Sequence, residues 1–192
     1  ARNELYGNEV NDALVVRLGL GPAPAGVRVE GPQAPTAEHA VAPVTVDLLG
    51  AGVLGIAGAR GPATDLARAV VAQVATLHTP HEVTMVVRSS DPGRRPGWSW
   101  AAWLPHLDGA RGTASATALG DLAGGSPPGG HAAVVVVLDG AHDLRRDTAV
   151  AEVLRLAAAQ ARAADHRREV PASRVVVLCL DDDVSRLPAE CR

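Results

Sequence analysis

The stretch GIAGARGPATDL, residues 55–66, combines an apolar approach, a glycine-rich turn and the first residues of a helix-like pattern. Apolar residues then recur with a period of 3.6, which predicts a helix over Pro62–His78, and a strand is expected just before the turn, over Val53–Ala57. This strand–turn–helix order predicts one unit of an α/β fold. The turn lies where phosphate-binding loops lie in such units, and its residues decide whether it can hold a phosphate.

The same alternation of apolar strands and helices continues along the chain. Runs without polar alternation, separated by helices, predict a mainly parallel sheet covered on both faces. Upstream, β-branched stretches and a segment rich in Pro and Ala predict a β-containing N-terminal segment and linker. We expect this segment over residues 1–42 and the α/β domain over residues 43–192. Further strands are predicted over 14–20, 27–30, 44–49, 83–88, 134–138 and 174–180, one helical turn over 114–122, and a helix over 149–165.

Composition excludes several classes of function. All 18 basic residues are Arg, so every mechanism that needs a lysine amine is excluded. The net charge of −3 predicts no nucleic-acid partner, since duplex binders carry a basic surface. Two cysteines are too few for a disulfide framework and indicate a reducing compartment. The longest apolar run, 132–138, is far shorter than the roughly 20 residues of a membrane span.

The glycine-rich turn aligns with the pattern G-x-x-x-x-G-K-[ST], in which backbone amides and a Lys hold phosphates and a hydroxyl binds Mg²⁺. Gly58 takes the first position, with Gly61 inside the loop, and Ala63 stands where the second glycine belongs. Thr64 replaces the Lys, and Asp65 replaces the Ser or Thr. These positions predict a loop that keeps its backbone outline but has lost its positive charge.

A second motif lies in VVVVLDGAHD, residues 134–143. An apolar strand ending in Asp139 has the form in which an Asp holds Mg²⁺ at the carboxyl edge of the sheet. Gly140 follows, where an active ATPase usually has a Glu that polarises water. Taken alone, Asp-Gly after a strand is equally consistent with a simple turn. With the altered loop, common descent from P-loop NTPases is the better explanation, and we expect a three-layer, P-loop NTPase-like domain.

Other sites have weaker support. A dinucleotide fingerprint fails because Ile56 stands where its first glycine belongs, and Asp91 has no clear ribose-binding context. His78 and His81 are expected at a helix end rather than around a metal. The acids 181–183 are expected to form a solvated turn, with Mg²⁺ binding as the alternative. We therefore expect no metal site and no catalytic residue in this chain.

The segment GWSWAAWLPHL, residues 97–107, holds all three tryptophans of a chain with 2% aromatic residues. Some of the rings of Trp98, Trp100 and Trp103 are expected to pack into the core and anchor a loop. A ligand site is the less favoured alternative, because base-stacking aromatics normally stand among basic residues. His106 is expected to donate a hydrogen bond that fixes the loop.

The string W-x-W-x-x-W-L-P-H resembles a motif of the FtsK/SpoIIIE-type ATPases of type VII (ESX) secretion, of the EccC kind. Four shorter motifs extend the resemblance over nearly the whole chain. In sequence order they are V-R-L-G-L-G at 16–21, G-I-A-G-A-R-G from 55, V-V-V-L-D-G from 135 and L-P-x-x-C near 191. It lies with their first cytosolic domain, and the matching motif positions are Trp98, Trp100, Trp103, Leu104, Pro105 and His106.

The resemblance implies a non-catalytic coupling or interaction domain at the cytoplasmic face of the cell membrane. It implies no cofactor in this fragment, with ATP and Mg²⁺ used by a parent ATPase. Implied partners are other domains or subunits of a secretion machine and small helical secreted proteins, with membrane contact only through other segments of the parent. Two alternatives stay open: an ATP-binding domain with an atypical loop, in which Asp139 holds Mg²⁺, and a domain of an FtsK-like DNA translocase.

Overall fold

The computed structural model describes residues 14–24, 38–107, 116–123, 133–165 and 173–191. In these ranges strands and helices alternate from Val53 onward, as the apolar patterns predict. The elements are β1 (Val15–Pro24), β2 (Glu38–Asp47), α1 (Leu48–Ala51), β3 (Val53–Ala57), α2 (Arg60–Leu77), β4 (Val83–Ser89), η2 (Arg95–Trp103), α3 (Ala116–Ala123), β5 (Ala133–Asp139), α4 (Ala141–Leu144), α5 (Thr148–Asp165), β6 (Arg174–Asp181) and η4 (Val184–Arg186).

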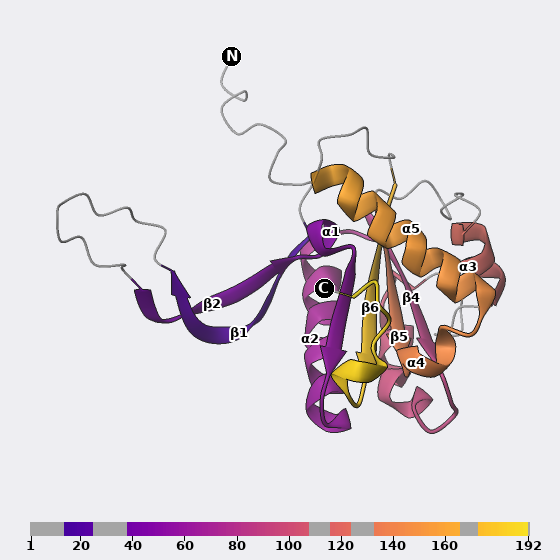
Figure 1. Cartoon of the computed structure of the whole chain (residues 1–192), viewed down its shortest axis with the longest axis horizontal. Coiled ribbons are helices and arrows are strands. Elements are labelled where there is room, and N and C mark those ends of the chain that lie inside the picture. Colours follow the sequence, from indigo (N-terminus) through magenta and orange to yellow (C-terminus); the bar gives the residue numbers. More distant parts are fainter. Residues whose placement is uncertain (1–13, 25–37, 108–115, 124–132, 166–172, 192) are drawn as a thin grey trace, which may run out of the picture.

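The centre of the molecule is a four-stranded sheet in the order β3-β6-β5-β4, with every neighbouring pair parallel. Every residue of β5 is buried, because helices cover both faces. One apolar cluster joins α2 to one face, and a second joins α3 and α5 to the other. Figure 1 shows α2 and α5 on opposite sides of the strands. The predicted three-layer, P-loop NTPase-like α/β fold is confirmed.

The N-terminal strands form a separate antiparallel hairpin that projects away from the sheet (Figure 1). β2 is longer at its start and shorter at its end than the predicted strand over 44–49. It ends because the Asp47 carboxylate accepts a hydrogen bond from the amide of Leu49, 3.0 Å away, and so caps α1. The strand expected over 27–30 lies outside the described residues. β2 crosses position 42, and the division of the chain there stays a prediction.

The hairpin is held to the sheet domain at its base. Val16 is buried in the cluster beneath α2, and Leu18 and Val46 pack against that cluster. The Gln73 side-chain amide accepts from the backbone N–H of Arg17 and donates to its carbonyl oxygen, both at 2.9 Å. Gln73 thus meets the outer edge of β1 as a neighbouring strand would. No helix in the described ranges has the length and apolar character needed to cross a membrane.

Candidate functional site at the carboxyl edge of the sheet

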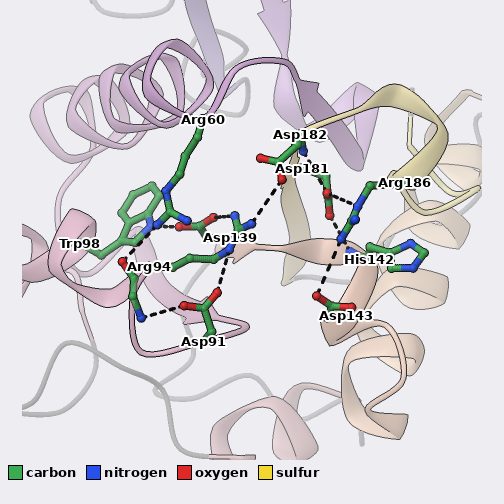
Figure 2. Close-up of polar contacts among 11 residues, drawn as sticks. Arg60, Asp91, Arg94, Trp98, Asp139, His142, Asp143, Asp181, Asp182 and Arg186 are labelled. Carbon is green, nitrogen blue, oxygen red and sulfur yellow. Dashed lines mark hydrogen bonds and ion pairs between the residues drawn. The ribbon is translucent and has the colours of Figure 1, made fainter.

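The carboxyl ends of β3, β5 and β6 meet at one edge, as a parallel sheet requires. The Gly58 amide donates to the Asp181 carbonyl oxygen at 3.2 Å, and the Gly140 amide donates to Leu180 O at 3.0 Å. Asp139, at the end of β5, is therefore a close neighbour of the end of β6. Figure 2 shows these acids facing a group of arginines from other elements. The edge joins the glycine-rich turn to the Asp139 strand end.

The glycine-rich turn is much shorter than the phosphate loop it aligns with. β3 ends at Ala57 and α2 begins at Arg60, so only Gly58 and Ala59 separate them. The amide of Ala63 already bonds to the carbonyl oxygen of Ala59, at 3.1 Å. The expectation that the loop keeps its backbone outline is wrong, because most of its residues form the first turns of the helix. Pro62 also removes one of the amides that such a loop would offer.

The aligned side chains point to different surroundings. Ala63 and Thr64 are buried, and a Cβ built on Gly97 would lie 3.8 Å from the Thr64 methyl, so Thr64 packs beside η2. Asp65 is exposed and forms an ion pair with Arg68 at 2.9 Å. Gly61 lies in the first turn of α2, and a side chain there would meet open space. The residue aligned with the Lys is therefore neutral and buried, whereas Arg60, the first residue of α2, reaches toward the site and donates to Gly93 O at 3.3 Å (Figure 2).

Asp139 is held by two donors from the segment after β4. Its side chain is nearly inaccessible, at 2% exposure. Arg94 Nη1 donates to Oδ1 at 2.7 Å, and the indole N–H of Trp98 donates to Oδ2 at 3.0 Å. Figure 2 shows both donors converging on the carboxylate. Each oxygen of the residue predicted to hold Mg²⁺ is thus bonded to the protein itself.

Arg94 carries the positive charge of this site. Besides Asp139 it contacts Asp91 at 3.1 Å and Asp182 at 3.7 Å. Burial lowers the pKa of the guanidinium, but the hydrogen bond and charge of Asp139, with the charges of Asp182 and Asp91, outweigh burial and raise it. Arg94 stays charged, and it occupies the side of Asp139 where a cation would otherwise neutralise the carboxylate.

Gly140 leaves no room for the glutamate of an active ATPase. Its φ of 86° lies in the left-handed region, which residues other than Gly adopt only at an energetic cost. A Cβ at this position would overlap Ser90 Oγ, lie 2.8 Å from Ser90 Cβ and lie 3.3 Å from Arg94 Nε. The donor set and the backbone therefore do not fit a magnesium ion with a polarising carboxylate beside it.

A second acid–arginine group lies at the end of β6. Buried Asp181 accepts from Arg186 Nε at 2.7 Å and from the amides of His142 at 3.0 Å and Asp182 at 2.9 Å. Burial raises the pKa of Asp181, but these two amides and the Arg186 charge outweigh burial and lower it below its ordinary value of 3.8. Arg186 also lies 3.8 Å from Asp143. Asp181 is therefore part of a buried polar junction, and the predicted solvated turn over 181–183 is wrong for this residue, whereas Asp182 and Asp183 are exposed as predicted.

Because Asp181 is ionised in this junction, the stability of the folded domain is expected to fall at acid pH. The pKa of Asp181 is lower in the folded than in the unfolded chain, so its contribution is complete above about pH 4 and is lost as pH falls through the folded value. We expect the melting temperature of the wild type to fall more steeply between pH 5 and 2 than that of Asp181→Asn, in thermal scans across that range. Parallel curves for the two proteins would contradict this role.

The three tryptophans have different surroundings within the 3-10 helix η2. Trp98 is buried, Trp100 is half-buried, and Trp103 is 89% exposed. The expectation that some of these rings pack into the core is confirmed by Trp98. Leu104 packs against the core cluster, whereas Pro105 is exposed.

The end of the tryptophan segment runs along the outer edge of β4. The backbone oxygen of His106 accepts from the Met85 amide at 2.7 Å and from Thr84 Oγ1 at 3.1 Å. The buried His106 imidazole has Nε2 2.7 Å from His78 O, and since a carbonyl oxygen only accepts, Nε2 donates. The predicted loop-fixing role of His106 is confirmed. In the described ranges no group of three or more His, Cys, Asp or Glu is placed to hold a metal.

Sequence reasoning missed Arg94, Asp91 and Arg186 as members of this site. A usable signal was the Asp91–Arg94 spacing, which places both side chains on one face of a single turn. The partner of Arg94 on β5, 45 residues away, leaves no local trace in the sequence. Conversely, the aligned loop residues do not join this cluster. Ala63 is buried in the core, Thr64 packs beside η2, and Asp65 forms an ion pair with Arg68.

Comparison with known proteins places the chain beside secretion ATPases. No family model matches. The ESX-4 secretion system protein EccC4 of Mycobacterium tuberculosis is 31% identical over 110 residues, 47% of this chain and 9% of that protein. The ESX-5 secretion system protein EccC5 of the same organism is 38% identical over 69 residues, 36% of this chain and 5% of that protein. The matches thus span less than a tenth of these relatives.

Two solved structures of Thermomonospora curvata EccC share the fold. One holds ATPases 2 and 3 in complex with a signal sequence peptide; it matches 93% of this chain and 34% of its own, with a TM-score of 0.58 and 20% identity. The other is the cytoplasmic domain of the type VII secretion ATPase EccC, matching 97% and 23%, with a TM-score of 0.54 and 22% identity. The resemblance predicted from the sequence is confirmed: this chain is similar in sequence to EccC proteins of type VII secretion and shares the fold of the EccC ATPase.

Proposed function

We propose that this chain is a non-catalytic coupling and interaction domain of a membrane-anchored FtsK/SpoIIIE-type ATPase that powers type VII secretion, at the cytoplasmic face of the membrane. The observation that carries the proposal is the Arg94–Asp139 ion pair at 2.7 Å, with Trp98 on the other carboxylate oxygen. Protein donors engage both oxygens of this carboxylate, and the Arg94 guanidinium supplies the positive charge that Mg²⁺ would supply in an active site. The phosphate position is vestigial, with Gly58, Gly61, Ala63, Thr64 and Asp65 as its remnant.

The ion pair also has a structural role at the sheet edge where an active relative would bind nucleotide. With the Trp98 hydrogen bond, it ties the end of β5 to Arg94, just before η2, and to Trp98 within η2. Trp98 anchors η2 in the core, and η2 carries Trp103 at the surface. The edge that holds nucleotide in an active relative therefore supports, in this chain, the position of an exposed aromatic ring.

Trp103 is the strongest candidate for the contact with a partner. An indole that is 89% exposed leaves a large apolar surface in water, and Trp is the residue type most enriched among energetically dominant interface residues. The candidate partners are other domains of the same secretion ATPase and small helical secreted proteins. One solved EccC relative is in complex with a signal sequence peptide, which supports the second class.

Two assays test the proposal. Phosphate release from Mg-ATP by the 192-residue chain should not exceed the blank, and turnover that disappears in Asp139→Asn would contradict a non-catalytic role. Binding to the recombinant ATPase modules of the parent, and to a secretion signal peptide, should weaken about tenfold or more in Trp103→Ala for the true partner. Val184→Ala, which truncates another exposed apolar side chain, 74% exposed on η4, is the control and should bind normally. Equal binding by both variants would exclude Trp103 as the docking residue.

A further inference from the structure

The two cysteines of the chain lie side by side, although 12 positions separate them in the sequence. Cys179, in β6, is fully buried, whereas Cys191, after η4, is half-buried. Gly55 is the register partner of Cys179 in the parallel sheet, so both present the same face. A Cβ on Gly55 would lie 3.1 Å from Cys191 Cβ and 3.4 Å from its Sγ. Leu187, whose Cδ1 would lie 2.6 Å from that Cβ, and Cys191 therefore share the space that Gly55 leaves open beside Cys179.

The two thiols differ in their chemistry because they are hydrogen-bonded to each other. The hydrogen bond from Cys179 lowers the pKa of the Cys191 thiol and outweighs the burial that raises it. The same hydrogen bond, with burial, raises the pKa of Cys179 well above its ordinary value of 9.0. The more accessible sulfur therefore ionises more readily than the buried one, and the thiolate is the form of cysteine that reacts.

We propose that Cys191 is an oxidation-sensitive thiol and that Cys179 is its resolving partner, so that peroxide-class oxidants convert the pair into an intramolecular disulfide. The Cys191 thiolate attacks one peroxide oxygen; the O–O bond breaks, Cys191 becomes a sulfenic acid, and the released hydroxide takes a proton to form water. The Cys179 sulfur then attacks the sulfenic sulfur. The S–S bond forms, and the displaced hydroxyl leaves with the Cys179 proton as a second water.

The disulfide acts on the segment that borders the arginine–aspartate edge. Residues 182–190 lie between the two cysteines, and this segment includes η4. Within it, Asp182 lies 3.7 Å from Arg94, and Arg186 bonds to Asp181 at 2.7 Å. A covalent link between Cys191 and β6 closes this segment into a loop against the sheet. Oxidation therefore fixes the side of the candidate site that β6 contributes.

The test treats the whole chain with hydrogen peroxide, blocks remaining thiols under denaturing conditions and measures the intact mass. The wild type should become lighter by two hydrogens and resist alkylation. A loop of this size predicts a melting temperature about 6–12 °C higher after oxidation, reversed by a thiol reductant. Cys191→Ser should stay reduced and unshifted, because its remaining thiol is buried. In Cys179→Ser, Cys191 should accumulate a sulfenic acid that dimedone traps.

Three results would overturn the proposal. One is a wild type that stays fully alkylatable under peroxide concentrations that oxidise Cys179→Ser. Another is a disulfide that joins two chains, seen as a dimer on non-reducing gels. The third is oxidation of Cys191→Ser at the wild-type rate, which would make Cys179 the sensitive thiol. Because Cys179→Ser changes a core residue, the comparison of wild type with Cys191→Ser decides the result without it.

Discussion

Arg94→Ala is expected to destabilise the domain by about 3–5 kcal/mol, because it leaves the Asp139 carboxylate buried without its counter-ion. The side chain of Asp139 is 2% exposed and that of Arg94 is 12% exposed, so water cannot replace the lost guanidinium. The Trp98 indole supplies only one neutral hydrogen bond to the opposite oxygen. Urea denaturation monitored by Trp fluorescence measures the change, with the midpoint shifting at an unchanged slope.

Arg95→Ala is the matched control, because Arg95 is the next residue, has the same side chain and is exposed. Its effect should stay within about 0.5 kcal/mol. The double variant Arg94→Gln/Asp139→Asn should recover part of the loss, because it removes both charges together. Equal, small effects of Arg94→Ala and Arg95→Ala would show that the ion pair does not stabilise the fold.

Gly140→Glu is expected to cost about 2–6 kcal/mol and to produce no ATPase activity. The substitution restores the residue type that an active ATPase carries after the Asp, so a merely decayed site would regain some function. At this position the backbone has φ 86°, and the new Cβ would overlap Ser90. Left-handed strain and overpacking each contribute about 1–3 kcal/mol. Thermal denaturation and a phosphate-release assay measure the two outcomes.

Gly61→Ala provides the contrast within the aligned loop. Gly61 lies in the first turn of α2, its φ is not in the left-handed region, and a side chain there meets open space. We expect this change to be neutral or to stabilise the domain by about 0.5 kcal/mol, since Ala favours helix more than Gly. A marked loss in Gly61→Ala, or a gain of turnover in Gly140→Glu, would indicate that the glycines still serve a phosphate loop.

The sheet could be predicted from the sequence because its strands coincide with uninterrupted runs of apolar residues. Residues 134–138 and 175–180 are buried, so local composition and final environment agree. The same reasoning failed at the glycine-rich turn. The pattern of glycines indicated a loop, whereas the backbone after Ala59 continues as helix and buries Ala63 and Thr64 in the core. The backbone becomes helical here because these residues pack against the core, and a local glycine pattern carries no information about that packing.

Only part of the cluster around Asp139 could be predicted from the sequence. The strand pattern placed Asp139 at the sheet edge correctly, and the tryptophan count indicated an anchored segment. The link between the two is a tertiary contact: Trp98 and Arg94 reach Asp139 across 41 and 45 residues of chain. The spacing to Asp91 is a local feature of Arg94, but it does not indicate that Arg94, rather than exposed Arg95, contacts Asp139. Only the fold, which carries the segment after β4 over the end of β5, selects one of the two.

Calorimetric titration of the chain with ATP in the presence of Mg²⁺ tests most directly whether Arg94 has replaced the metal at Asp139. If it has, millimolar Mg-ATP should give no binding heat beyond dilution, and Arg94→Gln should behave in the same way because the loop backbone is also lost. A dissociation constant in the micromolar range that requires Mg²⁺ and disappears in Asp139→Asn would contradict the proposal and identify this edge as a working nucleotide site.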